Sequence, residues 1–321
     1  MKKTHITALG EILIDYTPLP DSESGMPVFE QNPGGAPANV LACAARLGRS
    51  TALIGKVGDD MQGKFLLNCL RENRIDAAGV RVDNRYFTTL AFIHLSETGE
   101  RSFAFARKPG ADTQLSPDEL NRDLLRNSGI LHFGSLSLTD EPARGATMEA
   151  VRVAKEAGAV IAYDPNYRPL LWDCEKTAVR YMRMPLRNVD LLKVSDDELF
   201  LLTDTDDCCR GAKRLLEEGI RCVTVTKGNG GALVATCEGT AQVPAFSAQA
   251  VDTTGAGDSF WGGFLTCVSE SGRPVDQLTL EDFQKFARFG NAVASLCVER
   301  RGAMPAMPSR AEVAERLSGC G

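Results

Sequence analysis

The sequence predicts an α/β fold in which a mostly parallel central sheet is covered by helices on both faces. Short runs rich in β-branched residues alternate with longer runs of 3.6-residue hydrophobic period along the whole chain. Its 321 residues, 43% of them hydrophobic, can bury one large core or two modest ones without disulfides or metals. We find no internal repeat, and we expect a single domain over residues 1–321.

The central elements follow from these two periodicities. The expected core strands are residues 6–13, 51–57, 130–133, 160–164, 191–194 and 222–226. The expected helices are residues 37–47, 61–73, 143–157, 207–218, 256–271 and 280–298. The first helix has Pro37 near its beginning and Gly48 just after its end, which is the usual asymmetry of helix termini.

Two segments depart from this alternation. Residues 16–31 and 86–107 read as extended chain, and residues 95–101 between two alternating runs indicate a hairpin turn. A small β-layer that projects from the main sheet would accommodate both segments, and such projections often act as lids. The alternative is that both are edge strands of the main sheet.

Composition excludes several classes of protein. The formal net charge is −6 and no run of Lys or Arg forms a basic stripe, so we expect no nucleic-acid partner. Ten cysteines are scattered without a Cys-x-x-Cys pair, which favours free thiols in a reducing compartment. His5, His94 and His132 are isolated in sequence and are interpreted as structural.

The N-terminal region does not resemble a secretion signal. Glu11 and Asp15 interrupt the first apolar run before a signal-peptide core could form. No stretch approaches the length of a membrane span. We therefore expect a cytoplasmic protein with no membrane partner.

The most informative motif is Val-Asp-Thr-Thr-Gly-Ala-Gly-Asp-Ser-Phe at residues 251–260, at the beginning of a predicted helix. The first turn of a helix has unpaired N–H donors and a partial positive charge, so residues 255–257 could line a phosphate pocket. Asp258 would then take a proton from an attacking hydroxyl. Taken alone, the motif is equally compatible with an ordinary capping aspartate beside a glycine turn.

A second glycine-rich element, Pro-Gly-Gly-Ala-Pro-Ala-Asn at residues 33–39, also begins a predicted helix. Two such elements indicate two ligands. Three further runs accompany them: Gly-Glu-Ile-Leu-Ile-Asp at 10–15, Asp-Pro-Asn-Tyr-Arg-Pro-Leu-Leu-Trp at 164–172 and Val-Ser-Asp-Asp-Glu-Leu at 194–199. With these five motifs the chain resembles the ribokinase-like (PfkB) carbohydrate kinases. Within that family the resemblance is greatest to the fructokinases, and it spans nearly the whole chain.

The resemblance implies a ribokinase-like three-layer α/β/α body with a small β-sheet lid, and ATP-dependent transfer of a phosphoryl group to a sugar hydroxyl. For fructokinases that hydroxyl is the 6-hydroxyl of fructose. It implies that Asp258 is the catalytic base beside an anion-binding turn of Gly255, Ala256 and Gly257. We expect the helix N-terminus to keep Asp258 ionised and therefore a weak base, which a loose transition state tolerates.

The same resemblance implies the ligand contacts. The implied sugar-binding residues are Asp15, Gly34, Gly35, Asn39, Arg107 and Arg168, with the two glycines allowing a close approach of backbone to sugar. The implied ATP-binding residues are Ser195, Thr226, Gly228, Gly231 and Asn291. Glu198 would act on Mg²⁺ through water, and Asp252 and Thr254, with residues 301–303, would enclose a monovalent cation such as K⁺.

Structural alternatives apply to several of these residues. Ser195 can be a helix cap with acids in the first turn, and residues 226–231 can be a tight hairpin turn. Arg168 can be paired with Asp164, and Arg107 can be an exposed lid arginine.

Other functions are less compatible with the motifs. No Gly-x-Gly-x-x-Gly follows the first strand, which argues against a dinucleotide-dependent dehydrogenase, and no P-loop motif is present. A silent sugar or nucleotide sensor of the same fold would not need Asp258. Other family kinases, acting on 2-keto-3-deoxygluconate, ribose or a nucleoside, stay open, as does the choice between a monomer and a homodimer.

Overall fold

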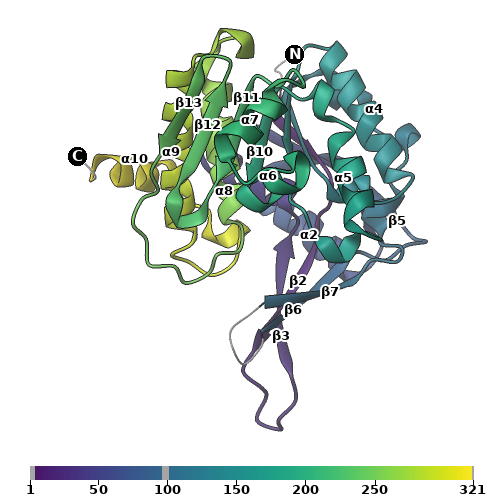
Figure 1. The fold of residues 1–321 in the computed structure, drawn as a ribbon. Helices are drawn as coiled ribbons and strands as arrows, with labels where there is room; N and C mark the ends of the chain where they lie inside the picture. The colour runs from purple at the N-terminus through teal and green to yellow at the C-terminus, as the bar shows by residue number, and fades with distance from the viewer. Residues whose placement is uncertain (1–3, 96–100, 320–321) are drawn as a thin grey trace.

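The computed structural model describes residues 4–95 and 101–319 and contains a large sheet and a small sheet that projects from the body (Figure 1). The large sheet has nine strands in the order β13-β12-β11-β10-β9-β8-β1-β4-β5. Their bounds are β1 (Thr4–Leu9), β4 (Thr51–Gly58), β5 (Ile75–Asp83), β8 (Ser128–Gly134), β9 (Val160–Asp164), β10 (Leu191–Ser195), β11 (Cys222–Thr226), β12 (Ala232–Thr236) and β13 (Gly239–Val243). Only the pairs that involve β12 and β13 are antiparallel, which confirms the mostly parallel sheet.

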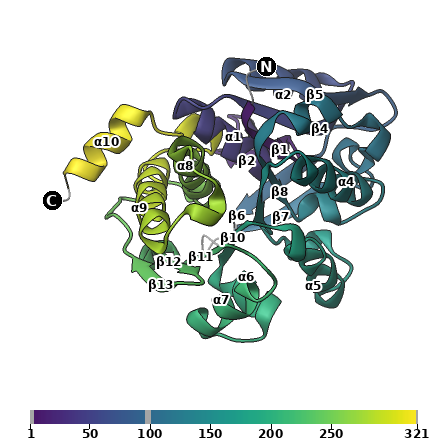
Figure 2. The same cartoon turned by 90° about the horizontal axis from the view of Figure 1, so that it is seen from above.

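Helices cover both faces of this sheet (Figure 2). One layer contains α1 (Ala36–Arg46), α2 (Met61–Glu72), α8 (Ala256–Ser271) and α9 (Leu280–Cys297), with α10 (Arg310–Ser318) packed on α9. The other contains α3 (Arg122–Arg126), α4 (Ala143–Glu156), α5 (Glu175–Arg183), α6 (Asp196–Thr203) and α7 (Cys208–Leu216). Successive strand residues alternate between the two cores, since Ile130 faces the first layer and Leu131 the second. The expected three-layer body is confirmed.

The predicted strand over residues 6–13 is wrong. β1 ends at Leu9, and β2 (Leu13–Leu19) begins a separate sheet after a break at Gly10, where φ is +152°. A Cβ at Gly10 would lie 2.6 Å from Pro37 Cγ, so the break is where the chain packs against the start of α1. Hydrophobic periodicity does not reveal such a break because both strands are apolar.

The small sheet confirms the expected separate β-layer. It contains β2, β3 (Val28–Gly34), β6 (Leu90–Leu95) and β7 (Arg101–Ala106), in the order β3-β2-β6-β7. β6 and β7 are antiparallel, as a hairpin requires, although the predicted turn itself falls on residues 96–100, outside the described residues. On one face Tyr16 stacks on Phe92, with ring centroids 5.2 Å apart.

The polar and sulfur-containing core residues behave as structural groups. His132 is buried, accepts a hydrogen bond from Trp261 Nε1, and has its pKa lowered to about 3 by burial. His5 contacts Ser50, and the side chain of His94 lies outside the described residues. Cysteines in the described residues are free thiols, and each helix there is too short or too polar to span a lipid bilayer.

Candidate active site

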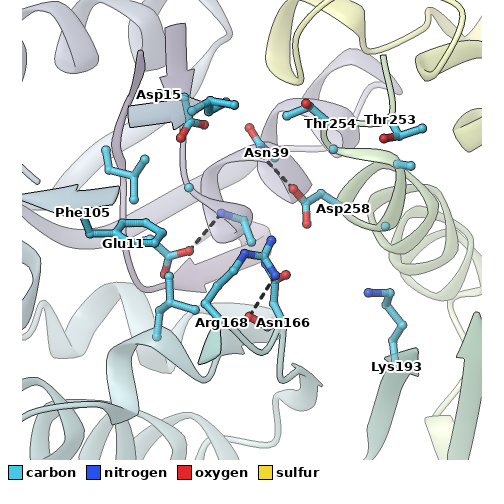
Figure 3. Close-up of a pocket in the computed structure, with 18 residues that line it drawn as sticks. Glu11, Asp15, Asn39, Phe105, Asn166, Arg168, Lys193, Thr253, Thr254 and Asp258 are labelled. Atoms are coloured by element: carbon cyan, nitrogen blue, oxygen red, sulfur yellow. Dashed lines mark hydrogen bonds between the residues drawn. The ribbon is translucent and has the colours of Figure 1, made fainter. Parts of the chain in front are cut away.

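A cavity of about 270 Å³, here called the first cavity, lies where the small sheet meets the body. Its walls come from β2, α1, the segment after β9, β10 and the first turn of α8, with Ile93 and Phe105 contributed by the small sheet (Figure 3). Its polar lining side chains are Glu11, Asp15, Asn39, Asn166, Arg168, Lys193, Thr253, Thr254 and Asp258. Carboxyl ends of parallel strands meet at one edge of a sheet, which explains why segments far apart in sequence converge here.

The two glycine-rich elements meet at this cavity through a direct hydrogen bond. Asn39, in α1, donates from Nδ2 to Asp258 Oδ2 at 2.8 Å. Asp258 is the third residue of α8, and Asn39 is the fourth residue of α1. This bond orients the Asp258 carboxylate and leaves its other oxygen available to a substrate hydroxyl.

The expectation that Asp258 is a weak, readily ionised base is corrected. Burial raises the pKa of Asp258 from 3.8 to about 6, which outweighs the hydrogen bond donated by Asn39. The nearby Asp164 carboxylate raises the pKa further, while Lys193 and Arg168 lower it. The helix N-terminus does not determine the pKa of Asp258, because the free-energy cost of desolvating the carboxylate exceeds the stabilisation that the first turn of α8 gives to its charge. A carboxylate of this pKa is still ionised at neutral pH and is a stronger base than an exposed aspartate.

The anion-binding turn is built differently from the expectation. Gly255 caps α8 with φ +75°, and a Cβ there would lie 2.8 Å from Ala303 Cβ. The Ala256 N–H donates to the Thr253 carbonyl at 3.2 Å, so it is not a free donor. In the described part of the chain, no residue accepts a hydrogen bond from the N–H of Gly255 or Gly257. The turn therefore offers two free N–H donors, those of Gly255 and Gly257, instead of the expected three, because the Ala256 N–H is bonded within the turn.

Asp15 lies in β2 and faces the first cavity. Burial raises the pKa of Asp15 to about 7, opposed by Arg168 and reinforced by Asp258. A Cβ at Gly34 would lie 2.0 Å from Asp15 Oδ2, and a Cβ at Gly35, whose φ is +103°, would lie 2.5 Å from the Glu11 carbonyl oxygen. Gly35 lines the cavity and Gly34 does not. Both glycines therefore make room for protein atoms, and the expectation that they also allow the sugar to approach the backbone stays a prediction.

Glu11 is a cavity residue that the motif analysis did not single out. Its Oε1 accepts the N–H of Ala36, the first residue of α1, at 3.0 Å, and its Oε2 is buried without a partner. Burial raises the pKa of Glu11 to about 7. An acidic residue just after a buried strand was the available signal, and Glu11 also belongs to the run at residues 10–15 that contributes to the resemblance.

The segment after β9 places two polar side chains, those of Asn166 and Arg168, at the cavity. Asp164 Oδ1 accepts the Asn166 N–H at 3.2 Å, and Asn166 has φ +48°. The Arg168 guanidinium donates to the carbonyls of Asn166 and Tyr167 at 3.4 and 3.0 Å. The alternative of an Arg168–Asp164 pair is wrong, because Asp164 is paired with Lys193 at 2.7 Å instead. Lys193 was also missed, although a lysine inside an apolar strand was a visible signal.

Arg107 does not line the first cavity. Its side chain is buried, paired with Asp112 at 2.7 Å, and donates to Thr139 Oγ1 and the Leu136 carbonyl. The interpretation as an exposed lid arginine is wrong, and its guanidinium donors are occupied by the body. Arg107 instead lies behind Phe105, where it attaches the end of β7 to the body.

A second cavity of about 250 Å³ adjoins the first. Four of the five residues expected to contact ATP line it, namely Thr226, Gly228, Gly231 and Asn291. The Asn291 amide donates to the carbonyls of Val243 and Pro244, so this side chain also supports the wall of the cavity. Thr253, Ala256 and Gly257 line both cavities, which places the beginning of α8 at their junction.

Ser195 and Glu198 form a capping box at the start of α6. Ser195 Oγ accepts the Glu198 N–H at 3.1 Å, and Glu198 Oε2 accepts the Ser195 N–H at 2.8 Å. Glu198 Oε1 accepts the Tyr167 N–H at 2.7 Å, which ties the segment after β9 to α6. The cap reading of Ser195 is confirmed, and neither residue lines the two cavities.

Asp252 joins the two loops that were expected to enclose a monovalent cation. Its Oδ1 accepts from the N–H and the hydroxyl of Thr254 at 2.9 and 2.7 Å, and its Oδ2 accepts the Gly302 N–H at 3.0 Å. A cavity of about 20 Å³ lies beside these residues and is also lined by Asp15 and Arg301. This space suits one water-sized occupant.

Comparison with known proteins gives matches over the whole chain. The sequence signature of the pfkB family carbohydrate kinases matches residues 3–310. Probable fructokinase-4 of Arabidopsis thaliana is 40% identical, over 99% of this chain and 98% of the relative. A fructokinase with bound ATP from Xylella fastidiosa is 33% identical, with a TM-score of 0.92 and 99% of each chain covered. A double-mutant fructokinase from Vibrio cholerae, in a fructose, ADP and potassium ion bound form, is 31% identical, with a TM-score of 0.85 and 99% of each chain covered.

Proposed function

This chain belongs to the pfkB family of carbohydrate kinases and is therefore a phosphotransferase that acts on a sugar hydroxyl, and we propose that it is an ATP-dependent fructokinase. The proposed reaction converts ATP and D-fructose into ADP and D-fructose 6-phosphate. The single observation that carries the proposal is the junction of two cavities at the first turn of α8, with Asp258 on the wall of the first.

The geometry supports direct in-line transfer. Fructose occupies the first cavity with its 6-hydroxyl at Asp258, and ATP occupies the second cavity with its terminal phosphate at Gly257. The hydroxyl oxygen forms a bond to the γ-phosphorus, the bond between that phosphorus and the β,γ-bridging oxygen breaks, and the hydroxyl proton passes to Asp258. The N–H groups of Gly255 and Gly257 stabilise the charge on the transferring group.

The charge of the first cavity favours a neutral sugar. Three carboxyl groups line it, from Glu11, Asp15 and Asp258, against two basic side chains, from Arg168 and Lys193. A sugar acid such as 2-keto-3-deoxygluconate would add a further carboxylate beside three carboxyl groups whose pKa values are already raised by burial, so a further negative charge is unfavourable there. Fructose instead offers hydroxyl donors, which carboxylate oxygens accept.

We assign Mg²⁺ to the nucleotide phosphates, where it neutralises their charge when bound. Within the described residues, no cluster of three His, Cys, Asp or Glu side chains could hold a metal by itself. Both carboxylate oxygens of Glu198 accept backbone N–H groups. Each oxygen has a remaining lone pair, so Glu198 would contact the metal through a water molecule. EDTA is expected to abolish turnover, and added Mg²⁺ to restore it.

We assign K⁺ to the space beside Asp252 and Thr254, because it suits one small occupant and because a neighbouring fructokinase structure contains a potassium ion. ADP release is expected to be faster in potassium chloride than in tetramethylammonium chloride at equal ionic strength. Equal rates in the two salts would remove the cation from the proposal. We also propose a cytoplasmic location, which the proposed use of ATP and the free thiols of the described residues support.

A sugar panel tests the proposed function. The wild-type enzyme is mixed with ATP, Mg²⁺ and fructose, ribose, a nucleoside or 2-keto-3-deoxygluconate, and ADP release and the ³¹P spectrum of the product are measured. Fructose is expected to give the highest kcat/KM and a phosphomonoester at the 6-position. Preference for another sugar would refute the fructose assignment, and ligand binding without ADP release would indicate a sensor.

A further inference from the structure

Lys193 is a buried charged residue that the proposed reaction has not used. It is the middle residue of β10, between Leu192 and Val194, and only 6% of it is exposed. Its Nζ lies 2.7 Å from Asp164 Oδ2. Burial alone would lower the pKa of Lys193, but the carboxylates of Asp164 and Glu198 more than offset this and raise it. The side chain is therefore a permanent ammonium inside the protein.

The ammonium lies against the junction of the two cavities. A Cβ at Gly257 would lie 3.0 Å from Lys193 Nζ, so the ammonium occupies the space that a side chain would need there. Gly257 lines both cavities, and Lys193 lines the first. In Figure 3 the Lys193 side chain extends from β10 toward the first turn of α8. This is the place through which a phosphoryl group must pass between the cavities.

The local charge balance requires a cation at this place. The Asp164 carboxylate, which lines neither cavity, is close enough to Asp258 to raise its pKa, so without Lys193 a phosphoryl group at the junction would lie near the uncompensated charge of both carboxylates. The other basic side chain of the cavity, Arg168, is held by backbone carbonyls of its own loop. Lys193 is therefore the group placed to compensate charge at the junction.

We propose that Lys193 is a catalytic residue that turns from Asp164 to the transferring phosphoryl group and stabilises its charge together with the Gly257 N–H. Asp164 holds the ammonium in place before ATP binds and remains close enough to keep it oriented. No bond is made or broken at Lys193, which acts as a fixed positive charge. The inference rests on the proposed kinase reaction but not on the identity of the sugar.

A purely structural role is the competing explanation, and the chain contains a matched example of it. Lys56, in β4, is also buried and pairs with Asp83 at 3.0 Å and Glu119 at 2.7 Å, yet none of these three residues lines the first or second cavity. Replacing both partners of a structural buried ion pair by apolar residues is often well tolerated. The two lysines therefore separate the cost of removing a buried ammonium from the loss of a phosphate contact.

The test compares K193M, D164N and K193M/D164N with K56M and K56M/D83N, each checked for folding by thermal unfolding. K193M is expected to lower kcat by roughly 100- to 1,000-fold, the usual effect of removing one donor to a developing anion, with a small change in the KM for sugar. K193M/D164N is expected to stay as slow, because removing Asp164 does not return the phosphate contact. Recovery of activity in this double variant, or an equal loss of kcat in folded K56M, would overturn the proposal.

A binding measurement keeps the test independent of the sugar. Calorimetric titration is expected to show that K193M/D164N loses about tenfold more affinity for the non-hydrolysable ATP analogue AMP-PNP than for ADP, since only the former has the γ-phosphate. Equal losses for the two nucleotides would place Lys193 away from the γ-phosphate and overturn the assignment. The kinetic measurements use whichever sugar the wild-type enzyme phosphorylates. The test of Lys193 therefore remains valid even if the enzyme does not phosphorylate fructose.

Discussion

At the scale of single residues, two opposed influences on Asp258 define its chemistry. Burial and the Asp164 carboxylate favour the neutral form, while Asn39, Lys193 and Arg168 favour the charged form. The result is a carboxylate that is ionised at neutral pH and has higher proton affinity than a surface aspartate. Its remaining oxygen faces the cavity, which suits a base that acts late in phosphoryl transfer.

Replacement of Asp258 by Asn is expected to lower kcat by roughly two to four powers of ten, because the amide cannot accept the hydroxyl proton. Affinity for sugar and nucleotide should stay near normal, since the Asn39 contact can be kept by the amide oxygen. Coupled ADP-release kinetics and calorimetry check the two parts. Asp123→Asn, at an exposed position in α3, is the matched control and should leave kcat unchanged. A rate for D258N similar to that of D123N would remove Asp258 from the role of base.

The pH dependence of kcat/KM follows from the same carboxylate. Because the pKa of Asp258 is raised to about 6, the base is deprotonated above this pH and becomes protonated as pH falls below it. We expect kcat/KM to decrease about tenfold for each pH unit below 6. The surrounding titratable or charged groups are Asp15, Asp164, Arg168 and Lys193, and Asp15, on β2, titrates together with Asp258.

Stopped assays from pH 4.5 to 8 in buffers of constant ionic strength measure this profile. The residual activity of D258N should lack the acidic limb with a midpoint near 6. A wild-type profile that is flat down to pH 5 would contradict the raised pKa.

At the scale of elements, helix termini do most of the positioning. α1 begins with its Ala36 N–H bound by Glu11, α6 begins with a reciprocal Ser195–Glu198 cap, and α8 begins with the Gly255 turn. Each of these starts lies at the edge of the large sheet where parallel strands end. The starts of α1 and α8 therefore present first-turn groups to the first cavity, whereas the α6 cap residues line neither the first nor the second cavity.

Gly35 gives a test of how tightly the start of α1 is packed. Gly35→Ala must adopt φ +103° and also displace the Glu11 carbonyl, 2.5 Å from the new Cβ, whereas Gly48→Ala has a similar φ of +94° and open space. We expect the free energy of unfolding to fall by about 1 kcal/mol for G48A and by about 3 kcal/mol or more for G35A. Urea unfolding measures both values, and similar losses would mean that the packing at Gly35 contributes little.

At the scale of the whole molecule, the small sheet forms one wall of the first cavity and the body forms the others. Ile93 and Phe105 come from β6 and β7, Asp15 comes from β2, and Asp258 comes from α8 (Figures 1 and 3). The sheet is attached to the body at the ends of β2 and β7, where Gly10 marks the break before β2 and Arg107 is anchored by Asp112. This attachment suits a lid that moves as a unit.

We predict that fructose closes this lid over the first cavity. Amide hydrogen exchange in β6 and β7 should slow when fructose is added, because the strands then become more completely shielded and less mobile. β13, at the far edge of the large sheet, is the internal control and should exchange at the same rate with and without sugar. Exchange in β6 and β7 that does not change at a saturating concentration of a sugar that the enzyme phosphorylates would contradict closure.

Much of the fold could be predicted because its signals are local. β9 and β11 have the predicted bounds, and α8 was predicted over the same residues that it occupies. β5, β12 and β13 were not predicted. β12 and β13 have only five residues each, and β5 has nine but does not alternate regularly between buried and exposed residues. The single strand predicted over residues 6–13 failed because an apolar run does not show where a chain leaves one sheet for another.

The sequence by itself determined the alternation of strands and helices, the two glycine-rich helix starts and the chemical types of the residues near them, because propensity, periodicity and turn chemistry depend on near neighbours. Only the tertiary structure decided which distant groups share an environment. It paired Lys193 with Asp164, placed Asn39 on Asp258, raised the pKa of Asp258 and withdrew Arg107 into the body. Burial and charge pairing across separate segments are properties of the packed chain, since they arise only when the elements have come together.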